Sequence, residues 1–129
     1  VVRESGLAEN GWVAVDRDNL MTPFPDVFAV GDVVGIPMAK AGVFAENAAG
    51  VVADDIIARL HGETLGRRYE GQGNCYIEFG SGRVAKVVAN FLGGPSPTAT
   101  VVGPSAELAA EKAEFAPARR ARWFGEASA

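Results

Sequence analysis

An aspartate follows a short apolar run in the first part of the chain. Residues 27–30 (VFAV) are continuously apolar, and Gly31 and Asp32 come directly after them. Such a run predicts a strand buried on both faces, as in a parallel sheet covered by helices. Asp32 would then lie at the carboxyl end of the strand, where open α/β sheets bind ligands, and could accept hydrogen bonds from sugar-alcohol hydroxyl groups. Gly-Asp is also an ordinary strand-to-loop turn, so the two residues alone allow both interpretations.

The longest expected helix begins shortly after this turn. Apolar residues recur at helical spacing over residues 41–60. The stripe comprises Phe44, Ala48, Val51, Val52, Ile56 and Leu60. A helix start presents free N–H groups and a positive dipole end to an electron-rich ligand group. Lys40, Ala41 and Gly42 lie at this start, and residues 61–62 (HG) are expected to close the helix.

The chain has one cysteine, Cys75, within the apolar residues 74–79. A single cysteine forms no internal disulfide, and the sequence has no Cys/His cluster, so we expect no metal site. A lone cysteine among aromatic and β-branched residues is most often a small buried hydrophobe. A cysteine that does chemistry must instead be available as a thiolate.

The second half of the chain predicts a small sheet followed by a helix. Residues 74–79 and 83–91 are typical of two strands joined by a Gly-Ser-Gly turn, and residues 100–102 of a third strand. We expect Ser105 to cap a helix and Pro117 to end or kink it.

Charge divides the chain near residue 66. Residues 1–66 carry 4 basic and 10 acidic residues, a net charge of −6, whereas residues 67–129 carry 8 basic and 6 acidic residues, a net charge of +2. We therefore expect a domain boundary at about residue 66.

The first part also contains one further expected strand, because residues 11–16 alternate in polarity.

Composition excludes several classes of protein. The chain has 129 residues, a formal net charge of −4 and a pI near 5.0, which argues against general nucleic-acid binding. No run reaches the ~18 apolar residues of a membrane-spanning helix.

The sequence begins at Val1 without an initiator Met or a signal-peptide pattern, so we expect a cytoplasmic chain that starts inside a larger protein. Residues 119–124 combine arginines with two aromatic residues. They could contact an anionic membrane surface, or they could form a polar helix end whose aromatic side chains pack on the domain, so peripheral membrane contact is one of two alternatives.

Several longer strings resemble one family. Residues 22–32 (TPFPDVFAVGD) resemble the second flavin-binding motif of the FAD-dependent pyridine nucleotide–disulfide oxidoreductase superfamily. Residues 37–46 (PMAKAGVFAE), 69–80 (YEGQGNCYIEFG) and 112–125 (KAEFAPARRARWFG) are similar to its branch of sulfide:quinone oxidoreductases and flavocytochrome sulfide dehydrogenases. The resemblance covers nearly the whole chain, as the C-terminal third of such an enzyme.

The resemblance implies an α/β fold. Residues 1–66 would form the C-terminal portion of a Rossmann-like FAD-binding domain. Residues 67–129 would form a small α+β C-terminal domain that mediates dimerisation or lies on the quinone side. The sequence has no G-x-G-x-x-G motif, so the ADP-binding half of the FAD site would lie outside this chain.

The resemblance also implies roles for the residues around the first turn and the long helix. Asp32, preceded by Gly31, would bind the ribityl chain of FAD. Lys40, Ala41 and Gly42 would lie beside the isoalloxazine ring, where the helix dipole stabilises negative charge. Many relatives carry Thr at the position of Ala41, so one hydroxyl contact is missing in this sequence.

Cys75 would be one member of a redox pair beside the flavin. It would take up sulfide sulfur as a thiolate and pass electrons to FAD, with quinone as the acceptor. Its partner cysteine would lie outside this chain. Two alternatives remain: an NADH-oxidising flavoprotein of the same superfamily, which needs no such cysteine, and a non-catalytic dimerisation or interaction module. A homodimer also stays open.

Overall fold

The computed structural model describes residues 4–64, 66 and 68–125, which form a mixed α/β structure with two small sheets and a few helices. The chain divides into two compact units. The first unit contains the chain up to Gly73 together with Ala89–Thr98, and the second contains Asn74–Val88 together with the chain from Ala99 onward. The domain boundary expected at about residue 66 stays a prediction.

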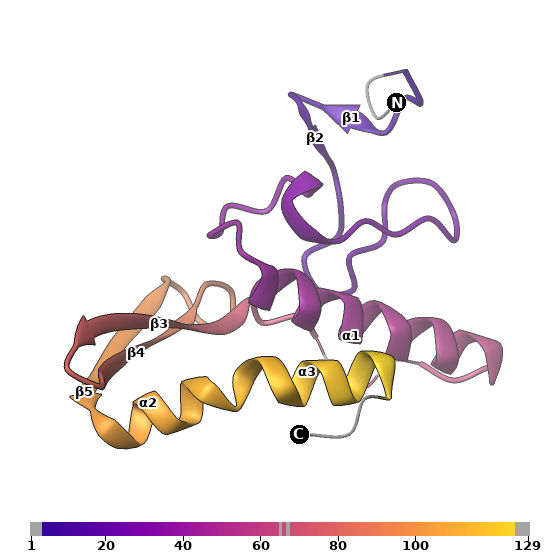
Figure 1. Ribbon diagram of the computed structural model, residues 1–129. Helices are drawn as coiled ribbons and strands as arrows, with labels where there is room; N and C mark the ends of the chain where they lie inside the picture. Colours follow the sequence, from indigo (N-terminus) through magenta and orange to yellow (C-terminus); the bar gives the residue numbers. More distant parts are fainter. Residues whose placement is uncertain (1–3, 65, 67, 126–129) are drawn as a thin grey trace. The chain divides into compact units, whose positions relative to one another are not determined.

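The first unit opens with a hairpin (Figure 1). β1 (Ala8–Glu9) pairs antiparallel with β2 (Trp12–Val13). Asn10 and Gly11 connect them with φ angles of 51° and 87°, the left-handed conformation that two-residue hairpin turns require. The strand predicted over residues 11–16 is therefore shorter than expected.

Residues 27–30 form no strand, although the whole segment lies within the described part of the chain, so the prediction of a buried parallel strand is wrong there. Phe28 makes a single antiparallel bridge with Met21, and a 3-10 helix, η1 (Gly31–Val33), follows. A strand needs a neighbour for its backbone hydrogen bonds. The sheets of the described residues provide none beside this segment, so a Rossmann-like sheet is not confirmed.

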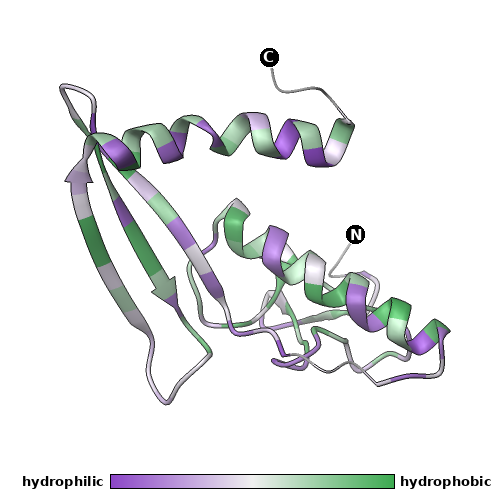
Figure 2. Ribbon diagram, turned by 90° about the horizontal axis from the view of Figure 1, so that it is seen from below, coloured by the Kyte–Doolittle hydropathy of each residue, from purple (hydrophilic) through white to green (hydrophobic). Residues whose placement is uncertain are grey.

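α1 (Gly42–Leu60) confirms the long helix predicted over residues 41–60. It contributes Ala48 and Val51 to the hydrophobic core of the first unit. The buried members of that core are Leu20, Val34, Ile36, Ala48, Val51 and Tyr69. The predicted apolar stripe is buried only in part, because Leu60 is 81% exposed. Figure 2 shows hydrophobic residues along α1 as far as its carboxyl end.

The end of α1 confirms the predicted closing residues. His61 is the C-cap, and Gly62 follows with a φ of 71°. The N–H of Gly62 donates to the carbonyl oxygen of Arg59 at 3.0 Å, and the N–H of Glu63 to that of Ala58 at 2.8 Å. These two bonds satisfy carbonyl groups that the end of a helix otherwise leaves unpaired.

The second sheet confirms the predicted hairpin and third strand. β3 (Gln72–Gly80), β4 (Arg83–Asn90) and β5 (Thr98–Ser105) are ordered β3-β4-β5. The connection between β3 and β4 has positive φ angles at Ser81 and Gly82, 49° and 66°, as a tight hairpin turn requires.

Two helices follow the sheet almost end to end (Figure 1). Ser105 caps α2 (Ala106–Ala113), because its hydroxyl oxygen accepts a hydrogen bond from the N–H of Leu108 at 3.2 Å. Pro117 lies in the first turn of α3 (Phe115–Phe124), where it has no N–H to donate to the preceding turn. The predicted cap and the predicted break near Pro117 are both confirmed.

Candidate functional site

A hollow in the first unit brings together four of the residues predicted from sequence. Gly31, Asp32, Lys40 and Ala41 all line it. Its volume is only about 10 Å³, about the room that one water molecule needs, whereas pockets for drug-sized ligands hold about 300–1,000 Å³. The described residues thus form one shallow wall and not a formed cofactor site. Cys75 belongs to the second unit.

Asp32 lies in η1 and is exposed. Gly31 before it has a φ of 79°, which favours glycine, and a Cβ at this position would lie 3.6 Å from the Cβ of Ala45. η1 therefore lies beside the first turn of α1, at a distance that leaves room for an ordinary contact. The carboxylate of Asp32 stays accessible to hydrogen-bond donors from a ligand.

The start of α1 has no side-chain cap. Ala41 is the N-cap in an extended conformation and offers no acceptor, and Gly42 is the first helical residue. No heavy atom lies within 4 Å of a Cβ built on Gly42, so the helix start is open. An uncapped N-terminus favours an anionic or electron-rich group.

Lys40 is engaged by the loop that precedes α1. Its Nζ donates to the carbonyl oxygen of Val34 at 2.6 Å and to that of Ile36 at 3.3 Å. The same ammonium lies 4.7 Å from the centre of the Trp12 ring. The sequence could not show these contacts, because two of the partners are backbone carbonyl groups.

Tyr69, the first residue of the 69–80 string, also lines the hollow, although its residue type alone predicted no role there. The residue is 5% exposed, and its hydroxyl donates to the carbonyl oxygen of Phe44 at 3.1 Å. Burial raises the pKa of Tyr69 to about 12. A buried tyrosine needs a partner for its hydroxyl, and here the first turn of α1 provides it.

Close packing explains why glycines stand at two positions of the 69–80 string, Gly71 and Gly73. A Cβ on Gly73 would lie 2.6 Å from the ring of Phe44, and a Cβ on Gly71 would lie 3.0 Å from Cγ of Leu92. Both positions therefore exclude larger side chains. The Gly-x-Gly spacing was the signal in the sequence for this close packing.

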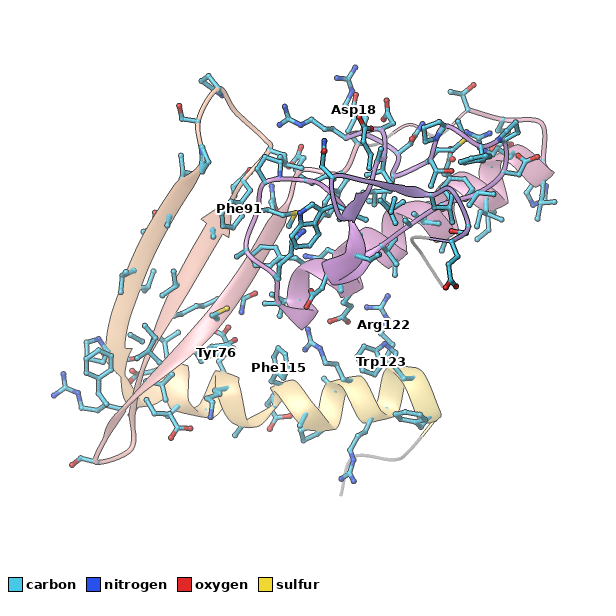
Figure 3. The ribbon with its side chains drawn as sticks, turned by 90° about the horizontal axis from the view of Figure 1, so that it is seen from above. Asp18, Tyr76, Phe91, Phe115, Arg122 and Trp123 are labelled. Atoms are coloured by element: carbon cyan, nitrogen blue, oxygen red, sulfur yellow. The ribbon has the colours of Figure 1, made fainter. Side chains whose placement is uncertain are left out.

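Cys75 lies on β3 and is an exposed free thiol, so the expectation of a buried hydrophobe is wrong. Its neighbour Tyr76 faces the helices of the second unit: the Tyr76 hydroxyl donates to Glu111 at 2.5 Å. The rings of Tyr76 and Phe115 point toward each other and meet edge to face, with centroids 6.2 Å apart (Figure 3). Because side chains alternate along a strand, the thiol lies on the opposite face of β3.

A surface network ties β3 and β4 to α2. Glu111 accepts hydrogen bonds from Lys86 and Tyr76, each at 2.5 Å, and Lys112 pairs with Glu78. The hydrogen bonds from Lys86 and Tyr76 lower the pKa of Glu111, and the bond to Glu111 raises the pKa of Lys86. We interpret this exposed network as structural.

The aromatic residues at the end of α3 are exposed. Trp123 is 55% and Phe124 is 72% exposed, so they are not packed as the simpler interpretation of residues 119–124 expected. The guanidinium of Arg119 stacks over Phe115 at 3.5 Å from the ring centre. Within the described ranges, no helix combines the length and hydrophobicity that crossing a membrane requires.

Known proteins of similar sequence indicate the class of enzyme to which this chain is related. No protein-family model matches the chain. An FAD-dependent oxidoreductase of Flammulina velutipes is 35% identical over 66 residues, which are 50% of this chain and 20% of that protein. The mitochondrial sulfide:quinone oxidoreductase of Schizosaccharomyces pombe is 33% identical over 93 residues, 70% of this chain and 20% of the relative. The resemblance to a sulfide:quinone oxidoreductase-like FAD-dependent oxidoreductase is thus confirmed.

The chain spans about one fifth of the length of these two relatives. A solved structure shares the fold: a chain in the mitochondrial ATP synthase of Tetrahymena thermophila matches with a TM-score of 0.61 and 24% identity. The match covers 72% of this chain and 23% of that chain. At this identity the likeness concerns the fold alone.

Proposed function

We propose that this chain is part of an FAD-dependent oxidoreductase that passes electrons from sulfide to quinone. The similarity to the sulfide:quinone oxidoreductase of Schizosaccharomyces pombe over 93 residues carries the proposal. Residues 1–66 would belong to a Rossmann-like FAD-binding domain and residues 67–129 to a small α+β domain. FAD, when bound, would take electrons from the donor and pass them to the acceptor.

The proposed cofactor-binding residues are Gly31, Asp32, Lys40, Ala41 and Gly42. Support comes from the hollow, because the first four line it and Gly42 begins the helix beside it. The carboxylate of Asp32 would accept hydrogen bonds from ribityl hydroxyl groups. The start of α1 would stabilise negative charge on the ring. The chain alone should bind FAD poorly, because it lacks the phosphate-binding turn that supplies much of the affinity.

Cys75 is the proposed redox residue. Its exposure supports this role, because a reactive cysteine must be accessible as well as ionisable. Its partner would come from outside this chain, which has no second cysteine. An NADH-oxidising flavoprotein would not need the thiol, so the effect of replacing Cys75 distinguishes the two activities.

The proposed flavin contact can be tested by FAD retention in full-length Asp32→Ala protein. Retention should weaken by about 1–3 kcal/mol, the size of a hydrogen bond to a charged group. Asp32→Asn keeps one acceptor oxygen and should give an intermediate loss. Glu63→Ala removes another exposed carboxylate of the first unit and is the matched control. Unchanged flavin content in Asp32→Ala would show that Gly31 and Asp32 only form a turn.

A further inference from the structure

The loop between η1 and α1 is irregular but held by several contacts. Val34 forms a parallel bridge with Val13, and the N–H of Gly35 donates to the Val13 carbonyl oxygen at 2.9 Å. The side chains of Val34 and Ile36 belong to the hydrophobic core, each 4% exposed. Lys40 then reaches back over the loop and binds the carbonyl oxygens of Val34 and Ile36.

We propose that Lys40, grouped above with the cofactor-binding residues, serves that site as a positioning residue, which acts through this loop and not through its charge on the cofactor. The ammonium group bridges two carbonyl groups and so fixes the path of the chain from η1 to α1. η1 carries Asp32, and the first turn of α1 begins at Gly42. The inference rests on the proposed function, in which Asp32 and the start of α1 contact FAD.

The ammonium group of Lys40 is stabilised by uncharged groups of the protein itself. Two of its three N–H donors have carbonyl acceptors, and the Trp12 ring covers it at 4.7 Å. The loop also passes close to Trp12 at Gly35, where a Cβ would lie 3.3 Å from the Cβ of Trp12, a tight contact. Hydrogen bonds from a charged donor are stronger than neutral ones, so they can hold a loop that has no regular structure.

The test compares three variants of the full-length protein. Lys40→Met removes the ammonium group but keeps an unbranched apolar stem. Lys40→Arg keeps charge and donors and can stack on Trp12. Arg17→Met removes another exposed cation of the first unit and is the matched control. We would measure FAD retention, the unfolding temperature of the apoprotein and the midpoint potential of the bound flavin.

Lys40→Met should bind FAD about three- to tenfold more weakly, the scale of one ordinary net hydrogen bond, because the Lys40 side chain is exposed. Its apoprotein should also unfold at a lower temperature, and Lys40→Arg should restore both properties. The midpoint potential should stay well within about 30 mV of wild type, the shift that corresponds to a tenfold change for a two-electron couple.

Two results would overturn the inference. A shift in potential of about 30 mV or more with unchanged unfolding would place the Lys40 charge beside the ring. If FAD retention, the midpoint potential and the unfolding temperature were all unchanged in Lys40→Met, Lys40 would have no role in the site. A wild-type protein without flavin would contradict the proposed function instead, and a destabilised Lys40→Met apoprotein would then still support the loop contact.

Discussion

The two units of the molecule are stabilised in different ways. The first unit is mostly irregular around α1, and its loops are held by a buried apolar core and by contacts such as those of Lys40 and Tyr69. The second unit consists of regular strands and helices, but among its described residues only Val84 and Ala85 are buried hydrophobics. Its side-chain contacts include a surface network around Glu111.

This difference bears on where substitutions should act. The first unit should be sensitive to packing, because its loop geometry depends on buried contacts. The second unit should tolerate changes to its surface pairs, since exposed ion pairs contribute little to stability. It also carries the exposed thiol, where a change should affect chemistry and leave folding intact.

The largest expected effect is a loss of activity, without a loss of stability, when Cys75 of the second unit is replaced. Cys75→Ser in the full-length protein should abolish sulfide-dependent flavin reduction by several orders of magnitude while FAD stays bound, because a hydroxyl cannot replace a thiolate at neutral pH. Ile77→Val, a conservative change on the same strand, is the control. Anaerobic flavin bleaching by sulfide measures the effect. Wild-type rates of sulfide bleaching in Cys75→Ser would exclude Cys75 as the redox residue.

The next effect lies in the first unit and depends on pH. The pKa of Tyr69 is raised from 10.0 to about 12, so its contribution to stability is complete below about pH 10 and is lost as the pH rises toward 12. The loss should reach at most about 2–3 kcal/mol. Urea unfolding at several alkaline pH values should show a steeper fall for wild type than for Tyr69→Phe. Equal slopes would contradict the burial of this hydroxyl.

Packing in the first unit can be tested at Gly73. Gly73→Ala would place a Cβ 2.6 Å from the Phe44 ring and should cost about 1–3 kcal/mol of unfolding free energy. Gly94→Ala is the matched control, because its nearest atom would be the carbonyl oxygen of Ser96 at 3.9 Å. Chemical denaturation measures both variants. Equal stability of the two would mean that Gly73 does not pack closely on Phe44 of α1.

The smallest effect is expected in the surface network of the second unit. The pKa of Glu111 is lowered by its hydrogen bonds with Lys86 and Tyr76, so its contribution is present above the usual carboxyl pKa and is lost as the pH falls through the lowered value. Glu111→Gln should change the unfolding temperature little at neutral pH and reduce its dependence on salt. A large loss of stability would contradict the contrast between the two units.

The regular elements were predictable because their signals are local. The apolar period of α1, the turn glycines between β3 and β4, and the cap at Ser105 act within a few residues of chain. Residues 27–30 show the limit, because a strand needs partners that an apolar run does not specify.

The sequence predicted which residues belong to the candidate site but not the contacts that they make. Gly31, Asp32 and Ala41 were singled out from their string and line one hollow. The partners of Lys40 are carbonyl groups of a loop, and the exposure of Cys75 depends on which face of β3 the helices cover. Neither property follows from residue type, because both arise from tertiary contacts.

The central claim is that this chain is part of an FAD-dependent oxidoreductase that takes electrons from sulfide. The most direct measurement is the visible absorption spectrum of the full-length protein, titrated anaerobically with sulfide and, in parallel, with NADH. We expect flavin bands that sulfide bleaches and NADH does not. A protein without flavin bands, or one bleached by NADH alone, would contradict the claim.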